Sequence, residues 1–132
     1  MASIRKILEL NIPAETAWSA LADFHNVHIR LVPGFLTGSS PDGGGARIVS
    51  FANGTTAKET LVTLDAAARR LVYFIASERV SHHNASAEIV PDGASRCRFV
   101  WTTDILPDAL APYIDAQMSE GAKAMKAKLE SA

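Results

Sequence analysis

The segment DALAPYIDAQMSEGAKAMKAKL, residues 108–129, decides how the rest of this chain must fold. Its apolar side chains recur at steps of three or four, at Leu110, Ile114, Met118, Ala122, Met125 and Leu129. This spacing places them on one stripe of an α-helix. Pro112 is typical of a first helical turn, so we expect the helix to begin near Ala111. A long helix with a single apolar stripe needs an apolar surface against which to pack.

The residues before this helix have the patterns of strands. Residues 4–12 alternate between apolar and polar side chains, which predicts a strand buried on one face. Two short helices are predicted next, at residues 14–24 and 26–30. Six further strands are predicted at residues 35–37, 47–52, 55–64, 71–76, 83–90 and 96–104, with residues 39–45 as a loop. Asn53 and Gly54 predict a two-residue hairpin turn, which would pair Ile48 with Glu59.

Together these elements predict an α+β fold. A curved antiparallel sheet of seven strands would wrap around the long C-terminal helix, and two short helices would follow the first strand and close one end. Strand alternation predicts which side chains face the helix: Leu71, Tyr73, Ile75, His83, Ala85, Ala87, Ile89, Cys97, Phe99, Trp101 and Thr103. Small side chains on both walls would leave room between sheet and helix, at Ala57, Ala85, Ala87, Gly121 and Ala122.

Composition limits the classes of function. The chain has 132 residues, 48% hydrophobic and 20% charged, which is typical of a single globular domain over residues 1–132. Thirteen basic and fourteen acidic side chains give no support for a nucleic-acid partner. A single cysteine, Cys97, excludes an internal disulfide and a thiol-rich metal site. The start of the chain lacks the apolar core of a signal peptide and no run approaches ~18 apolar residues, so we expect a cytoplasmic protein without a membrane span.

Several short phrases, in this order and spacing, resemble a known family. They are Ile12-Pro13-Ala14-Glu15 with Trp18, Ala22-Asp23-Phe24, Val32-Pro33-Gly34, Gly45-Ala46-Arg47, Glu59-Thr60-Leu61 with Asp65, Tyr73 with Ile75, and Val100-Trp101. The chain resembles the helix-grip or START-like (SRPBCC) superfamily, and within it the bacterial polyketide cyclase/dehydrase-like branch. Residues 28–31 and 82–84 depart from the family pattern at positions that usually border its cavity. The resemblance therefore leaves the ligand and the chemistry open.

The resemblance implies an apolar cavity between sheet and helix. The expected ligand-binding residues are Glu59, Leu61, Leu71, Tyr73, Ile75, His83, Ala85, Ala87, Phe99, Trp101, Met118, Ala122 and Met125. Within this set, Glu59, His83 and Tyr73 are the candidate catalytic residues. No cofactor is expected, and no metal, because adjacent histidines on a strand point to opposite faces and nothing completes a ligand set.

Glu59 and His83 each allow two interpretations. A buried carboxylate at Glu59 would bind polar ligand atoms or act as a general base, whereas Arg47 on the neighbouring hairpin arm would make it half of a structural ion pair. His83 would either contact the ligand or act as an acid or base beside Tyr73. Alternatively, it would be a core or rim histidine whose ring nitrogens are hydrogen-bonded within the protein.

Three functions follow from these alternatives. The leading hypothesis is a protein, monomer or homodimer, that binds a small hydrophobic ligand such as a polyketide, an aromatic or a lipid-like molecule. The second is a cyclase/dehydrase-type enzyme, a lyase or isomerase that works by general acid/base catalysis without metal or nucleotide. The third is an interaction module with a filled core, which an outward apolar patch of Phe51, Phe74 and Val72 would support.

Overall fold

A computed structural model describes residues 1–131 and has the predicted architecture. The strands are β1 (Ala2–Leu10), β2 (Leu36–Pro41), β3 (Ala46–Phe51), β4 (Thr56–Asp65), β5 (Arg70–Ile75), β6 (His82–Pro91) and β7 (Cys97–Leu106). The helical elements are α1 (Ala14–Ala22), a 3₁₀ turn η1 (Phe24–Asn26), α2 (Val27–Arg30), a 3₁₀ turn η2 (Asp108–Leu110) and α3 (Ala111–Leu129).

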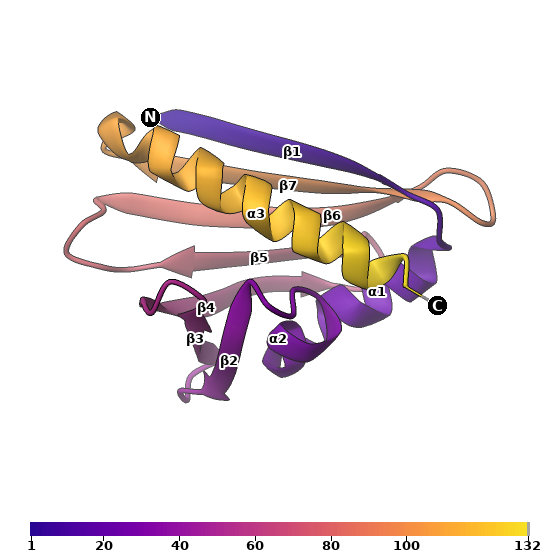
Figure 1. Cartoon of the computed structure of the whole chain (residues 1–132), viewed down its shortest axis with the longest axis horizontal. Coiled ribbons are helices and arrows are strands. Elements are labelled where there is room, and N and C mark those ends of the chain that lie inside the picture. The colour runs from indigo at the N-terminus through magenta and orange to yellow at the C-terminus, as the bar shows by residue number, and fades with distance from the viewer. Residues whose placement is uncertain (132) are drawn as a thin grey trace.

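All seven strands form one antiparallel sheet in the order β1-β7-β6-β5-β4-β3-β2. Figure 1 shows α3 lying across one face of this sheet, with α1 and α2 at the end where α3 finishes. The predicted α+β helix-grip fold is therefore confirmed, with α3 beginning at Ala111. The predicted inner faces are also confirmed, since Leu71, Ala87 and Phe99 are buried on the side that faces α3.

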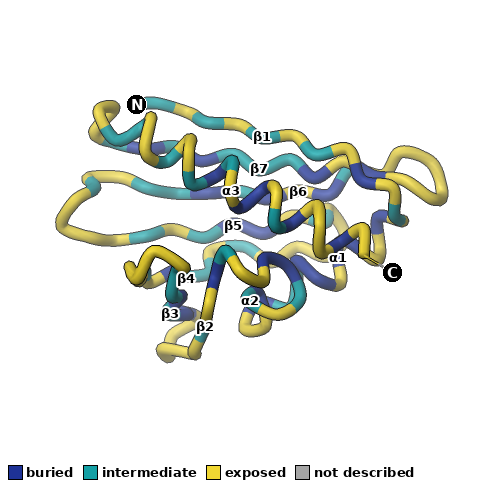
Figure 2. The backbone as a smooth tube through the Cα atoms, in the orientation of Figure 1, coloured by how far each residue is buried: buried dark blue, intermediate teal, exposed yellow. Residues whose placement is uncertain are grey.

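The apolar stripe of α3 is buried unevenly along the helix. Its last four members are buried, at Met118, Ala122, Met125 and Leu129, whereas Leu110 and Ile114 are only half-buried. Figure 2 shows the same change along the helix. The C-terminal half is also tied to the first strand, because the Lys126 ammonium donates to the backbone carbonyl oxygen of Glu9 over 2.5 Å. The first turns of α3 thus stand over less tightly filled space.

The β3–β4 hairpin corrects the predicted register. The Phe51 N–H donates to the carbonyl oxygen of Thr55 over 2.8 Å, which leaves a three-residue loop at 52–54. Gly54 has φ = +89°, the left-handed conformation that glycine supplies in loops of this length. The two-residue turn was therefore wrong by one residue, and Arg47, not Ile48, lies directly opposite Glu59.

The loop predicted at residues 39–45 is also partly wrong. Strand β2 continues through Ser39 and Ser40 to Pro41, which pair with Val49, Ile48 and Arg47 of β3. Pro41 is tolerated because β2 is an edge strand, where a missing N–H on the open side leaves no ladder bond unmade. Three consecutive glycines with positive φ make the turn itself, at residues 43–45.

Within residues 1–131 no helix is both long enough and apolar enough to span a membrane.

Candidate ligand-binding pocket

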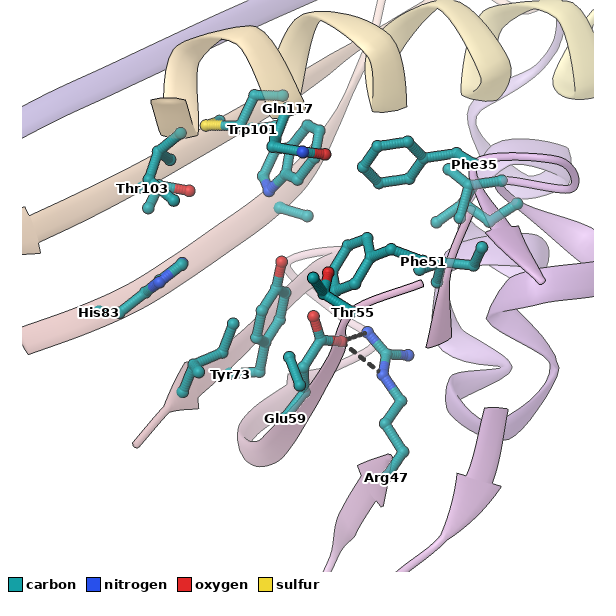
Figure 3. A pocket seen from close by; sticks show the side chains of 18 of the residues that line it. Phe35, Arg47, Phe51, Thr55, Glu59, Tyr73, His83, Trp101, Thr103 and Gln117 are labelled. Atoms are coloured by element: carbon teal, nitrogen blue, oxygen red, sulfur yellow. Dashed lines mark hydrogen bonds and ion pairs between the residues drawn. The ribbon is translucent and has the colours of Figure 1, made fainter. Parts of the chain in front are cut away.

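A pocket of about 260 Å³ lies between the inner face of the sheet and the first half of α3. Its walls come from β3 to β7, from the segment around α2, and from α3 (Figure 3). The lining is mostly apolar, with a few polar groups, as in small-molecule sites. Its volume lies just below the ~300–1,000 Å³ that is usual for such sites, so it has room for a small molecule.

Ten of the thirteen expected ligand-binding residues line this pocket: Glu59, Leu71, Tyr73, Ile75, His83, Ala87, Phe99, Trp101, Met118 and Met125. Leu61, Ala85 and Ala122 lie outside its lining. Ala85 is fully buried because it pairs with Tyr73 on one side and Thr103 on the other, and these larger side chains cover its methyl group. Leu61 is half-buried against the core, and Ala122 is buried.

Two phenylalanines that the sequence interpretation missed form one side of the pocket. The rings of Phe35 and Phe51 meet edge to face, with centroids 5.5 Å apart. Phe51 therefore points inward, and the outward patch of Phe51, Phe74 and Val72 that would have supported the interaction module is not formed. The alternation of β3 indicated this direction, because Phe51 lies on the same face of the strand as the buried Arg47 and Val49. Phe35 begins the predicted strand at residues 35–37, which is too short for its alternation to show which face is buried, and so it gave no comparable signal.

An ion pair between Arg47 and Glu59 is buried in the wall of the pocket. Both side chains are less than a tenth exposed, and Nη2 and Nε of Arg47 lie 2.6 and 2.8 Å from Oε1 of Glu59. Arg47 also donates through Nη1 to the backbone carbonyl of Phe24 over 2.7 Å, and its guanidinium lies 3.9 Å from the centroid of the Phe24 ring. Both contacts to the carboxylate use Oε1, and Figure 3 shows the other oxygen directed to the pocket side.

Tyr73 is a neutral phenol at the centre of the same wall. Burial raises the pKa of its hydroxyl well above the usual value, and the nearby Glu59 carboxylate adds to the rise. Arg47 and the Trp101 indole N–H oppose this rise in pKa, and Figure 3 shows the indole beside the phenol. Tyr73 can therefore donate its proton in a hydrogen bond but does not ionise at physiological pH.

His83 lies further along the wall, close to Thr103 (Figure 3). Burial lowers the pKa of its imidazole, and the neighbouring His82 lowers it further. The ring is therefore neutral at pH 7, with one donor and one acceptor nitrogen. Glu59 and His83 stand on strands β4 and β6, which are two strand spacings or about 10 Å apart at the backbone. The two groups border one pocket but do not form a direct proton-transfer pair.

A set of polar side chains connects α3 to the tip of the β3–β4 hairpin at the rim. The Tyr113 hydroxyl accepts from the Gln117 amide over 3.2 Å and from the Asn53 amide over 3.5 Å. Tyr113 and Gln117 line the pocket, and Asn53 lines a shallower groove beyond it. Among residues 1–131, no group of three or more His, Cys, Asp or Glu side chains is placed to hold a metal ion.

Solved structures with the same fold include enzymes and proteins of unassigned activity. An uncharacterized protein from Bacillus thuringiensis is similar at a TM-score of 0.85 and 18% identity, over 98% of this chain and 100% of that one. A norcoclaurine synthase point mutant from Thalictrum flavum, bound to a transition-state analogue, has a TM-score of 0.76 and 19% identity over 97% and 93% of the chains. The Zhui aromatase/cyclase from Streptomyces sp. R1128 has a TM-score of 0.74 and 18% identity over 97% and 90%. At such identities these likenesses show the fold alone.

None of the curated proteins matches the chain. The family model described as polyketide cyclase / dehydrase and lipid transport, however, matches residues 1–130. This match agrees with the sheet, the long helix and the pocket between them. The chain therefore belongs to the polyketide cyclase/dehydrase and lipid transport family.

Proposed function

We propose that this protein binds a small, largely apolar ring compound that carries oxygen substituents, in the pocket between the sheet and α3. The observation that carries the proposal is the lining itself: apolar and aromatic side chains surround a space that a few polar groups enter from one wall. Membership of a family of cyclases, dehydrases and lipid-transport proteins supports a ligand of this class.

The polar groups of the wall define which ligand atoms would be recognised. Tyr73 is a hydrogen-bond donor held in its neutral form, and the neutral His83 offers one donor and one acceptor. The second oxygen of Glu59 accepts from a ligand hydroxyl. A ligand with both a carbonyl and a hydroxyl group would satisfy all three residues, while the apolar lining residues, such as Ile75 and Trp101, contact its rings.

The size of the pocket favours one or two rings over a long polycyclic molecule. A volume of about 260 Å³ is at the small end of ligand sites. Binding would also stabilise the fold, because a ligand at 100 times its dissociation constant adds about 2.7 kcal/mol to the free energy of unfolding.

Native mass spectrometry of the purified protein tests this proposal directly. We expect a co-purifying small molecule in stoichiometric amount that is released on denaturation. A Tyr73→Phe variant should lose most of it, because the phenol hydroxyl is removed while the ring is kept. Thr16→Val, which removes an exposed hydroxyl outside the pocket lining, is the control. Absence of bound mass from several expression hosts, together with failure of 2-naphthol to bind or to raise the melting temperature, would contradict the proposal.

A second candidate is acid/base catalysis of the cyclase/dehydrase type in the same pocket. It is favoured by one observation, that a neutral imidazole and a neutral phenol border the same space. A neutral imidazole can accept an acidic α-proton, and a phenol can donate to the resulting enolate. His83→Gln should then abolish turnover of the bound compound while it still binds. Unchanged compound after prolonged incubation with the wild-type protein would exclude this function for that compound.

A further inference from the structure

Gly121 lies in the interior of α3, directly behind two walls of the pocket. A Cβ atom at this position would lie 3.1 Å from Cη2 and 3.2 Å from Cζ3 of Trp101, and 3.2 Å from Cε2 of Phe35. Carbon atoms in favourable contact are ~3.5–4.0 Å apart, so one methyl group would lie too close to both rings, and each ring would have to move by a few tenths of an ångström. Glycine is also an unfavourable residue in a helix interior, which makes its presence here a feature to be explained.

The two rings that touch Gly121 line the pocket, whereas Gly121 itself does not. Trp101 stands on β7 and reaches up to the helix, and Phe35 comes from the segment before β2 and meets Phe51 edge to face. Figure 3 shows Trp101 and Phe35 beneath α3. Both rings can rest against the helix backbone only because residue 121 has no side chain.

We propose that Gly121 sets the upper size limit of the ligand, because its missing side chain lets Trp101 and Phe35 lie back against α3 and keep the pocket wide. This inference rests on the proposed function and adds a residue that determines specificity without touching the ligand. Gly121 acts through the two rings, which its missing side chain allows to pack against the helix backbone.

An added methyl group would displace the rings and not the helix. The helix is fixed on both sides of Gly121, by the buried Met118 and Ala122 and by polar contacts to β1. These contacts are the ion pair of Lys6 with Asp115 and the hydrogen bond from Lys126 to the carbonyl of Glu9. Both rings, by contrast, border the open space of the pocket. Trp101 and Phe35 would therefore move into the pocket and narrow it.

Titration calorimetry with phenol, 2-naphthol and 2-anthrol tests the inference. These probes share one hydroxyl group and differ only in the number of rings. We expect Gly121→Ala to lower the affinity for 2-naphthol at least tenfold and to leave the affinity for phenol within about twofold. Trp101→Phe, which removes the two indole atoms nearest to Gly121, should restore part of the 2-naphthol affinity in the double variant. The same ratio of phenol to 2-naphthol affinity in Gly121→Ala and in the wild type would overturn the inference.

The control is Ala127→Gly, at an exposed position of the same helix that does not line the pocket, where the substitution loosens the backbone. It should leave the ratio of affinities unchanged, and a change in that ratio would mean that helix flexibility and not ring position sets the limit. If the wild type binds none of the three probes and no small molecule co-purifies with it, the proposed function fails. The ring position is then read without a ligand, from the indole ¹H–¹⁵N signal of Trp101. This signal should shift in Gly121→Ala and stay in place in Ala127→Gly, and an unshifted signal in Gly121→Ala would overturn the inference.

Discussion

Arg47 is the residue that holds the polar wall of the pocket together. Its guanidinium binds Glu59 of β4 and the backbone carbonyl of Phe24, and it lies over the Phe24 ring. A buried charge loses its hydration, and only such a full set of partners offsets the cost. Arg47 thereby joins η1, β3 and β4 at one point and fixes the direction of the Glu59 carboxylate.

Replacing Arg47 by methionine should destabilise the protein strongly. The carboxylate of Glu59 would be left buried without a counter-charge, and breaking a buried pair in this way costs about 3–5 kcal/mol. Urea denaturation measures the loss. The double variant Arg47→Met/Glu59→Leu should recover most of it, because no unpaired charge remains. A loss below about 1 kcal/mol in the single variant would mean that water reaches the pair, against its burial in the structure.

His83 should make stability depend on pH. Its pKa is lowered in the folded state by burial and by His82, so below its ordinary value of about 6.5 the unfolded chain binds more protons than the folded one. Its contribution to stability is therefore complete above pH 6.5 and is lost as the pH falls from there toward the folded-state pKa. We expect the wild type to lose more stability than His83→Gln between about pH 7.5 and pH 5, a range that spans the ordinary pKa, in urea titrations. Equal losses in the two proteins would contradict this, and the exposed His25→Gln serves as control.

At the scale of the element, α3 has two halves with different tasks. Its C-terminal end buries Leu129 in the core, and its N-terminal half presents Ile114 and Gln117 to the pocket. Between them, Met118 and Met125 are buried and also line the pocket. A single apolar stripe in the sequence thus covers both a packed interface and a ligand site. The sequence pattern alone does not separate the two, because both use apolar residues at the same helical spacing.

Alanine substitutions should separate the two halves. Leu129→Ala leaves a cavity in the core and should cost about 2 kcal/mol or more. Ile114→Ala removes a half-buried side chain and should lower the free energy of unfolding by less than half as much as Leu129→Ala. It should also change the affinity for 2-naphthol at least threefold, because Ile114 lines the pocket. Denaturation and calorimetry on both variants provide the comparison. A larger loss of stability in Ile114→Ala than in Leu129→Ala would refute this division of α3.

The β3–β4 hairpin shows where prediction from sequence ends. Residues Asn53 and Gly54 identified the turn, but the loop contains one residue more than expected, because Gly54 occupies the left-handed position of a three-residue loop. That one-residue difference decides that Arg47 and Glu59 are direct partners. Strand alternation is local and could be predicted, whereas register depends on the geometry of each turn.

At the scale of the whole molecule, the strands have fewer covering neighbours toward β2 than at β7. Strand β7 is paired on both sides, by β1 and β6, and α3 covers β1, whereas β2 is an edge strand paired only with β3. The pocket rim lies at the β3–β4 end of this series. For the well-covered strands, the face on which each side chain lies could be predicted from the alternation of apolar and polar residues. Phe35 and the Asn53–Tyr113–Gln117 contacts could not, because they depend on how distant segments meet.

Amide hydrogen exchange should become faster along the sheet from β7 to β2. We expect the amides of β6 and β7 to exchange slowest and those of β2 fastest, since opening an edge strand breaks fewer contacts. A bound ring compound such as 2-naphthol should slow exchange mainly in the β3–β4 hairpin and in the first turns of α3. Mass spectrometry of peptide fragments after exchange measures both effects. A uniform slowing across the sheet would mean that the compound acts on global unfolding alone.

The uneven burial of α3 has a consequence for how such a protein can diversify. Because Ile114 and Gln117 in the first turns of α3 border the pocket and are only half-buried, substitutions there cost little stability. The last turn, which holds the helix in place through the buried Leu129, does not line the pocket and need not change. A lineage can therefore acquire a new small-molecule preference through successive single mutations at one end of one helix, without passing through an unfolded intermediate sequence.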